Sequence, residues 1–325
     1  MALTPEQKEL RKTGIGGSEV AAVIGCHPYL TAGELALRKR GLLPEPVISN
    51  KHTERGERLE VALVEWVSHR LEVATVHNRA TVRGPGVLLA TPDGYEIQGQ
   101  DKIGIVEAKS PGPNTINRWT PPDQDPEGVP DHYLCQVHWA MGVTGLSQAR
   151  VAVLLGGDFF VYTIPFNRDF FDVMAYRAQE FWDRYVTAEE TPPVQGAEDL
   201  EWVQKYWPKN KTEKLSPPES MEQARVLELR IRDYCGAKIL ADEATSEAKL
   251  ARAHLVAYIA DGAGFKGDGW SVSYKRTKDG QETDWKAVAL EAGAGEAIVQ
   301  KHTKTKPGHR RFLARHATLD SNTED

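Results

Sequence analysis

Apolar residues in the first seventy positions recur at helical spacing. Residues 16–25 (GGSEVAAVIG) place Ser18 ahead of an apolar run and end at a glycine, as a capped helix does. Residues 31–41 repeat this pattern over a shorter length, and residues 53–71 extend it. The apolar stripe of the third segment is Leu59, Ala62, Leu63, Trp66 and Val67. The pattern predicts three helices, with Glu60 at the edge of the third apolar stripe.

After residue 72 the spacing of apolar residues changes from helical to alternating. Residues 74–82, 87–97 and 102–110 alternate, or run short and apolar, between glycines and prolines, which predicts a meander of strands. Residues 110–130 are rich in proline and polar side chains and predict a long loop.

The next segments return to helix and then to strand. Residues 131–145 predict a helix ended by glycine, and residues 148–157 and 158–166 predict a hairpin. Residues 168–186 form a long amphipathic pattern, which we expect to cover one face of the sheet. The sequence therefore predicts an α/β (α+β) core, with a central mixed sheet flanked by helices.

A change of composition over residues 188–220 predicts a domain boundary near residue 215. The expected domains are residues 1–214 and a C-terminal extension, residues 215–325. Within the extension, residues 221–260 predict a helix and residues 264–285 a strand or hairpin. The apolar face expected on this helix holds Leu227, Ile231 and Tyr234.

Two roles of the C-terminal third stay open. Residues 301–316 carry six Lys or Arg and no acid, so they could contact phosphates or form a final strand with solvated lysines. The helix over 221–260 could mediate self-association or bind a single-strand annealing protein.

Composition narrows the class of protein. With 40% hydrophobic and 26% charged residues, the chain has the balance of a globular protein. Its net charge of −6 argues against a basic coat on nucleic acid, while leaving room for a local basic channel. The three cysteines form no metal or disulfide spacing, the N-terminus is polar, and no apolar run reaches about 18 residues. We therefore expect a cytoplasmic protein without a membrane segment.

The candidate chemistry lies in the predicted strands. Glu107 and Lys109 are two apart in an apolar run, so they share a face. Asp93 begins the preceding strand, and a hairpin of the two strands would bring both carboxylates together. Two adjacent carboxylates ionise together only when a cation lies between them, and Mg²⁺ is the usual cation beside phosphates.

A structural interpretation competes with this one. Asp-Gly favours turns, and Glu-x-Lys on a strand is usually an ion pair. Against that, Ile105 and Val106 flank Glu107 in a strand that we expect to be buried, and a proline-rich loop follows it, as at the mouth of a cleft.

Five blocks of the sequence, taken in order, resemble a known family. The blocks are RKTGIGGSEVAAVIGCHPYLTAGELALRKRG, RGERLEVALVEWV, ATPDGY, GIVEAKSP and YLCQVHWAMGVTG, within about residues 10–185. Together they resemble the PD-(D/E)xK nucleases, and specifically the YqaJ-like viral recombinases of the lambda-exonuclease type. The resemblance implies a restriction-endonuclease-like core.

The resemblance also implies site residues. Asp93, Glu107 and the carbonyl of Ala108 match metal ligands, Glu60 matches the helical acid that completes the metal site, and Lys109 matches the catalytic lysine.

Two further pairs match less central positions. Gln136 and Tyr133, one helical turn apart, match a pair lining the active site, and Arg11 and Ser18 match a pocket for a DNA 5′-phosphate. From the residues alone, Ser18 could be an ordinary helix cap and the Gln136–Tyr133 pair a packing contact.

The function implied is a Mg²⁺-dependent DNA exonuclease of phage-type recombination, with Mn²⁺ able to substitute. It would act on double-stranded DNA ends from 5′ to 3′, in the cytoplasm of a host cell. The resemblance also implies a homo-oligomeric ring. A metal-dependent endonuclease and a non-catalytic DNA-binding or assembly protein remain alternatives. The presence of Asp93, Glu107 and Lys109 argues against the non-catalytic one.

Overall fold

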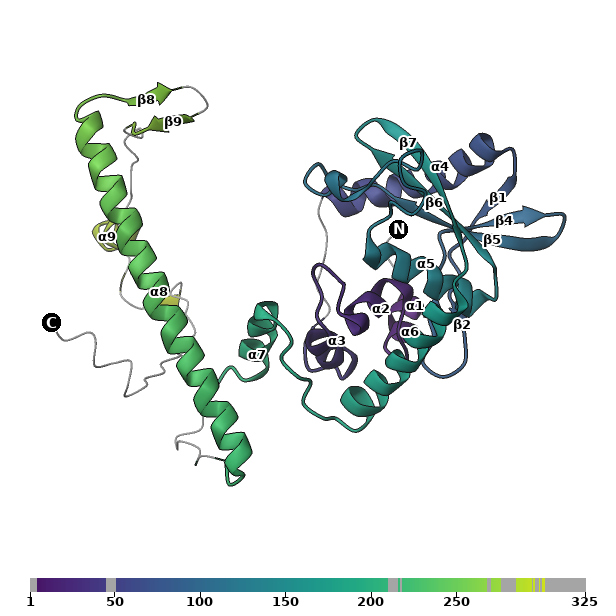
Figure 1. Ribbon diagram of the computed structural model, residues 1–325, viewed down its shortest axis with the longest axis horizontal. Helices are drawn as coiled ribbons and strands as arrows, with labels where there is room; N and C mark the ends of the chain where they lie inside the picture. The colour runs from purple at the N-terminus through teal and green to yellow at the C-terminus, as the bar shows by residue number, and fades with distance from the viewer. Residues whose placement is uncertain are drawn as a thin grey trace. The chain divides into compact units, whose positions relative to one another are not determined.

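The computed structural model of this chain describes residues 5–44, 51–209, 216, 218–267, 270–275, 285–293, 295, 298, 300 and 301. The chain divides into two compact units, Met1–Trp207 and Pro208–Asp325 (Figure 1). The division falls close to the boundary predicted near residue 215.

The first unit is built on a five-stranded sheet. Its strands, in spatial order, are β1 (Ala74–His77), β4 (Gly94–Gln98), β5 (Asp101–Lys109), β6 (Gln148–Leu155) and β7 (Asp158–Pro165). Only the β5–β6 pair is parallel, so the sheet is mixed, as predicted. The predicted hairpin over 148–166 is confirmed as β6 and β7.

One predicted strand is divided in two. Residues 87–97 form β3 (Leu89–Ala90), which pairs with β2 (Val82–Arg83), and then β4 of the central sheet. Pro92 lies at the break, where it has no N–H to donate to a ladder.

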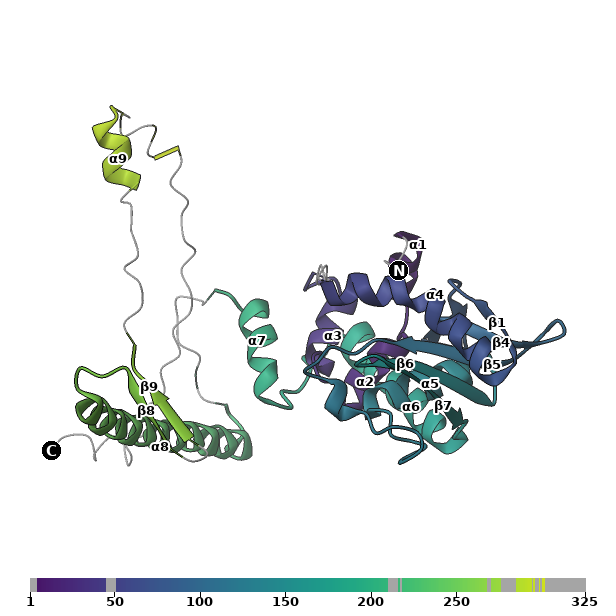
Figure 2. The same cartoon turned by 90° about the horizontal axis from the view of Figure 1, so that it is seen from above.

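Helices cover both faces of this sheet. Helix α4 (Lys51–Leu71) contacts β1, β5 and β6 on one face, and α5 (Asp131–Thr144) contacts β5 and β6 on the other (Figure 2). Side chains buried between α4 and the sheet are Leu63, Val64, Val67, Val106 and Ala152. The sequence wrongly assigned Ala62 to the buried stripe of α4. Ala62 is exposed, and Val64 is buried instead.

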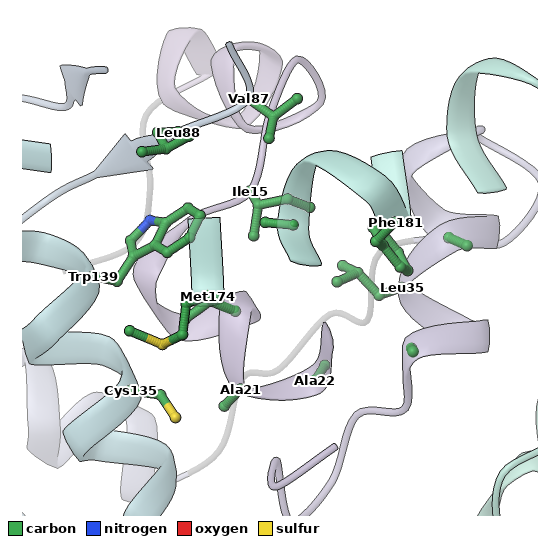
Figure 3. Close-up of a cluster of buried hydrophobic side chains, with 14 of the residues drawn as sticks. Ile15, Ala21, Ala22, Leu35, Val87, Leu88, Cys135, Trp139, Met174 and Phe181 are labelled. Atoms are coloured by element: carbon green, nitrogen blue, oxygen red, sulfur yellow. The ribbon is translucent and has the colours of Figure 1, made fainter. Parts of the chain in front are cut away.

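Helix α6 (Arg168–Phe181) does not cover the sheet, so that prediction was wrong. It packs on α5 and on α2 (Gly17–Ile24), because α5 already occupies the sheet face. Its apolar side chains, including Met174 and Phe181, complete a second core with Ile15 and Trp139 (Figure 3). The short helix α3 (Ala32–Lys39) adds Leu35 to the same core.

Within the described residues of the first unit, sequence patterns missed several short helical segments. They are α1 (Pro5–Arg11), α7 (Leu200–Tyr206) and the single 3₁₀ turns Ile116–Arg118 and Ala197–Asp199. Helix α7 lies within the change of composition over residues 188–220, yet its Trp202 is buried against Leu37 and Leu43. Val203 and Tyr206 of α7 pack on the same cluster, so apolar contacts hold this segment on the first unit.

The second unit contains α8 (Met221–Ile259), the hairpin of β8 (Gly264–Gly267) and β9 (Trp270–Ser273), and α9 (Trp285–Glu291). The helix and hairpin were predicted. Leu227, Ile231 and Tyr234 share one face of α8 as predicted, but Leu227 and Tyr234 are exposed while Cys235 and Ile259 are buried. The basic segment 301–316 lies outside the described residues beyond Lys301.

Within the described ranges, no helix has both the length and the apolar character that crossing a membrane requires.

Candidate active site

Strands β4 and β5 bring the two predicted carboxylates together. Their antiparallel register pairs Gly94 with Val106, so Asp93 lies opposite Glu107 at the end of the ladder. The Oδ2 atom of Asp93 accepts a hydrogen bond from the backbone N–H of Ala108 at 2.8 Å. The hairpin that the sequence predicted therefore forms, and it fixes Asp93 against β5.

The glycine after Asp93 is required by packing. A Cβ atom at Gly94 would lie 2.8 Å from Cγ1 of Val64 on α4 and 2.9 Å from the backbone oxygen of Val76. Both distances are shorter than real Cβ contacts allow, so only glycine lets α4 approach the strand that carries Asp93.

Glu107, Lys109 and Gln136 form one hydrogen-bonded group. The Oε1 atom of Glu107 accepts a hydrogen bond from Nζ of Lys109 at 2.5 Å and another from the Gln136 amide nitrogen. Lys109 also donates to Oε1 of Gln136 at 3.2 Å. The Lys109 ammonium lies 4.8 Å from the centre of the Tyr133 ring, one turn before Gln136 on α5. The structure thus brings four predicted site residues together from two elements.

Burial and charge set the protonation of this group. Burial raises the pKa of Asp93 well above its usual value, and the Glu107 carboxylate raises it further. Burial acts to lower the pKa of Lys109, but the carboxylates of Glu107 and Asp93 outweigh it and raise that pKa. Lys109 is therefore an ammonium at neutral pH, and the raised pKa of Asp93 reflects the cost of holding a second buried carboxylate beside Glu107 without a cation.

The donor set suits a hard divalent cation. Among the described side chains, the Oε2 atom of Glu107 is buried without a hydrogen-bond partner. A buried carboxylate oxygen left unpaired is costly unless a ligand completes it. Asp93, Glu107 and the Ala108 carbonyl could supply the oxygen ligands that Mg²⁺ prefers.

Glu60 is held at the edge of this arrangement. Its Oε1 atom lies 2.7 Å from Nε2 of His77 on β1. Burial acts to raise the pKa of Glu60, but its hydrogen bonds, including the one to His77, keep the pKa below the usual value. Across the part of the chain that the structure describes, no three His, Cys, Asp or Glu side chains group closely enough to hold a metal ion. Glu60 would therefore have to move towards Asp93 and Glu107 to act as a ligand.

Arg11 and Ser18 also meet, as the resemblance implied. The Arg11 guanidinium donates to Oγ of Ser18 at 2.6 Å and lies 3.8 Å from Glu19. Glu19 is buried and ion-paired at 2.8 Å with the buried Lys39 of α3, which also donates to the backbone oxygen of Arg11. Lys39 balances the charge of Glu19, so the guanidinium and hydroxyl stay available at the surface.

The helix start at Ser18 was placed wrongly. The N-cap of α2 is Gly16, whose N–H donates to Oε2 of Glu19 at 2.7 Å, and Ser18 is exposed within the first turn. The Ser18 hydroxyl therefore points away from the capping interactions, which removes the ordinary-cap interpretation.

A single cavity of about 570 Å³ joins these groups. Its lining includes every predicted site residue: Arg11, Ser18, Glu60, Asp93, Glu107, Ala108, Lys109, Tyr133 and Gln136. The volume is typical of sites for small ligands and cofactors, about 300–1,000 Å³.

Sequence reasoning missed three residues that support the site. Glu19 and Lys39 hold Arg11, and His77 holds Glu60. Glu19 follows Gly16 by three residues, which is the capping-box spacing and could have been noticed. For His77 and Lys39 the sequence carries no signal, since their partners lie on other elements.

Cys135 lies in the core rather than in the candidate site. Cys135 is buried in the core that includes α2 and α5, with its Sγ 3.5 Å from that of Cys26. Burial raises the pKa of the Cys135 thiol, which suits a core residue rather than a nucleophile.

Asp93, directly before β4, lies beside Glu107 and Lys109 of β5 in a mixed sheet, which is the arrangement expected of a PD-(D/E)xK site. Comparison of the sequence with known families narrows the class of protein further. Residues 6–147, which lie within the first unit, match the model of the YqaJ-like viral recombinase domain. The uncharacterized protein YqaJ of Bacillus subtilis (strain 168) is 27% identical over 245 residues, which are 74% of this chain and 73% of that protein.

Solved structures with a similar fold include two exonucleases. The alkaline exonuclease LHK-Exo from Laribacter hongkongensis is 18% identical with a TM-score of 0.46, over 62% of this chain and 97% of that one. A phage related exonuclease from Haemophilus somnus 129PT is 15% identical with a TM-score of 0.41, over 55% of this chain and 96% of the other.

Proposed function

We propose that this chain is a metal-dependent deoxyribonuclease that hydrolyses phosphodiesters at duplex DNA ends, from 5′ to 3′. The observation that carries the proposal is one cavity that holds both the Asp93–Glu107–Lys109 group and the Arg11–Ser18 pair. The first group suits hydrolysis of a phosphodiester, and the second suits capture of a terminal phosphate. The recombinase-family domain supports the same class of reaction.

Lys109 supplies positive charge rather than a base. Its raised pKa keeps the ammonium protonated while Glu107 fixes its direction. An ammonium held in a partly buried site stabilises negative charge that develops on a phosphate oxygen. Gln136 fixes the relative positions of the Glu107 and Lys109 side chains, because it hydrogen bonds to both.

The metal expected here is Mg²⁺, with Mn²⁺ able to substitute. Asp93, Glu107 and the Ala108 carbonyl would hold it, with Glu60 moving closer. When bound, the ion supplies Lewis-acid stabilisation of the phosphate and lowers the pKa of water.

The Arg11–Ser18 pair is the reason for proposing digestion from the 5′ end. A guanidinium and a hydroxyl side by side recognise a terminal phosphate, which has more charge and more free oxygens than a diester. A 5′-phosphate held there would place the adjacent diester in the same cavity as Lys109.

The test compares linear and covalently closed duplex DNA in Mg²⁺. We expect rapid loss of linear DNA with a 5′-phosphate, slower loss with a 5′-hydroxyl, and an almost inert circle. Equal cleavage of circle and linear DNA would favour the endonuclease alternative. Binding of DNA with no cleavage of either form in Mg²⁺ or Mn²⁺ would favour the non-catalytic alternative.

A further inference from the structure

A second hollow of about 330 Å³ adjoins the active-site cavity. The two share Ser110 and Tyr133 in their linings, so Tyr133 separates one from the other. None of the residues lining the second hollow is acidic, and Arg118 supplies a positive charge at its surface. A hollow of this kind suits an uncharged planar group attached to an anionic backbone.

Aromatic rings dominate the lining of this hollow. Trp119 lies 5.4 Å from Tyr133 between ring centres, and His132 lies 4.0 Å from Tyr133. His27 does not line the hollow, but it lies behind it, 6.3 Å from His132 and 6.3 Å from Tyr29 between ring centres. Trp119 is buried, while Tyr29 at the other end is 74% exposed.

His132, which lines the hollow, is uncharged at neutral pH. Burial, with further contributions from His27, Lys109 and Arg118, lowers the pKa of His132 to about 4. A neutral imidazole stacks on a base without repelling the nearby Lys109 ammonium.

We propose that this second hollow binds one unpaired nucleobase of the strand being cleaved, stacked among Tyr29, His132 and Tyr133. The inference rests on the proposed function. A base of any sequence has a π-face that can stack on these rings, and Arg118 would hold the adjoining phosphate. A hollow of this size excludes a duplex, so the base must leave its partner before it enters.

The position of Tyr133 relates this site to the reaction. Lys109 lies 4.8 Å from the centre of the Tyr133 ring in the active-site cavity, and the same residue lines the hollow. A nucleotide whose base enters the hollow would therefore have its phosphate beside Lys109. The hollow would hold the strand still while that phosphate is attacked.

The experiment measures binding in chelator, where no cleavage occurs. Single-stranded oligonucleotides with a 5′-phosphate carry one abasic residue at successive positions from that end. Fluorescence anisotropy gives the dissociation constant of each for the wild-type chain and for Tyr29→Ala/Arg118→Ala. Both side chains are exposed, so the double variant should fold.

A matched control is available on α6. Tyr176 is 71% exposed, Arg177 beside it is exposed, and neither lines the active-site cavity or the second hollow. Tyr176→Ala/Arg177→Ala removes the same two side-chain types elsewhere on the surface.

In the wild-type chain we expect an abasic residue at one position near the 5′ end to weaken binding by roughly tenfold, with little effect elsewhere. The Tyr29→Ala/Arg118→Ala variant should bind intact DNA about as weakly and show a flat profile, while the α6 control keeps the wild-type profile.

A flat profile in the wild-type chain, or an unchanged one in the Tyr29→Ala/Arg118→Ala variant, overturns the nucleobase site. If linear duplex is nevertheless degraded in Mg²⁺, the proposed function stands without it. A chain that neither binds nor cleaves DNA overturns both.

Discussion

Lys109 follows Glu107 by two residues on strand β5, and its Nζ donates a hydrogen bond to Oε1 of Glu107 at 2.5 Å. Both side chains leave one face of β5, and α5 covers them from that side with Gln136. The pair keeps a positive charge protonated next to a carboxylate that still has a buried, unpaired oxygen. The predictions below depend on this geometry.

Lys109→Ala should reduce the cleavage rate by about 10²–10³, because it removes one electrostatic donor from the reacting phosphate. Binding of DNA in chelator should change little. Single-turnover cleavage and anisotropy separate the two effects. Lys102→Ala, on the same strand but exposed, is the matched control and should cleave normally. If Lys109→Ala cleaves DNA within a few fold of the wild-type rate, Lys109 acts only as an ion-pair partner of Glu107.

Asp93→Asn should abolish cleavage and, in chelator, stabilise the fold at neutral pH. The raised pKa of Asp93 favours its protonated form in the native state, so its contribution to stability is complete below about pH 4. That contribution is lost as the pH rises through the folded-state pKa. The carboxamide never ionises, so the variant should unfold at a higher temperature than wild type from pH 7 to 8, by about 2–4 °C per kcal/mol.

The same comparison has its own controls. Asp101→Asn, exposed at the start of β5, should show no such shift in calorimetry at any pH. Adding Mg²⁺ should stabilise wild type and not Asp93→Asn, because only the native site binds the ion. If Asp93→Asn is less stable than wild type in chelator at pH 8, the charge on Asp93 is not desolvated as inferred.

Removal of the metal should stop the reaction, and Glu60 should control how much metal is needed. Activity should disappear in chelator and return with Mg²⁺ or Mn²⁺. Glu60→Gln should raise the Mg²⁺ concentration that gives half-maximal rate by about tenfold or more, since a ligand is lost. His77→Ala should raise it less, because His77 only orients Glu60.

Glu65→Gln serves as the control on α4, because Glu65 is exposed. Titrations of rate against Mg²⁺ for the three variants make the comparison. An unchanged metal requirement in Glu60→Gln would place Glu60 outside the metal site and leave it as a structural partner of His77.

Arg11→Ala should remove most of the preference for a 5′-phosphate over a 5′-hydroxyl while leaving the metal requirement unchanged. The reason is the loss of the guanidinium that lies 2.6 Å from Ser18. Lys12→Ala is the neighbouring control, since Lys12 is exposed and paired with Glu9. Rates on duplexes differing only at the 5′ end give the ratio for each variant, and a ratio in Arg11→Ala equal to that of wild type would exclude Arg11 from end recognition.

The order of elements in the first unit could be predicted because it depends on local periodicity. Strand alternation and helical spacing are set by neighbouring residues, so the sequence alone shows them. The errors arose where packing decided. Helix α6 has an apolar face, but that face meets α2 and α5 because α5 lies on the sheet. Helix α7 packs on the first unit because its Trp202 is buried against Leu37 and Leu43.

For the candidate site, the sequence alone was enough to select Asp93, Glu107 and Lys109 as candidates that lie together. Glu107 and Lys109 share a face through the two-residue period of a strand, and Asp93 joins them through a hairpin. The tertiary structure decided the rest: the Gln136 bond to Glu107, the His77 bond to Glu60, and the Glu19–Lys39 pair behind Arg11. Each of these contacts joins elements far apart in the chain. Their distances depend on how helices pack on the sheet, which no local pattern of residues encodes.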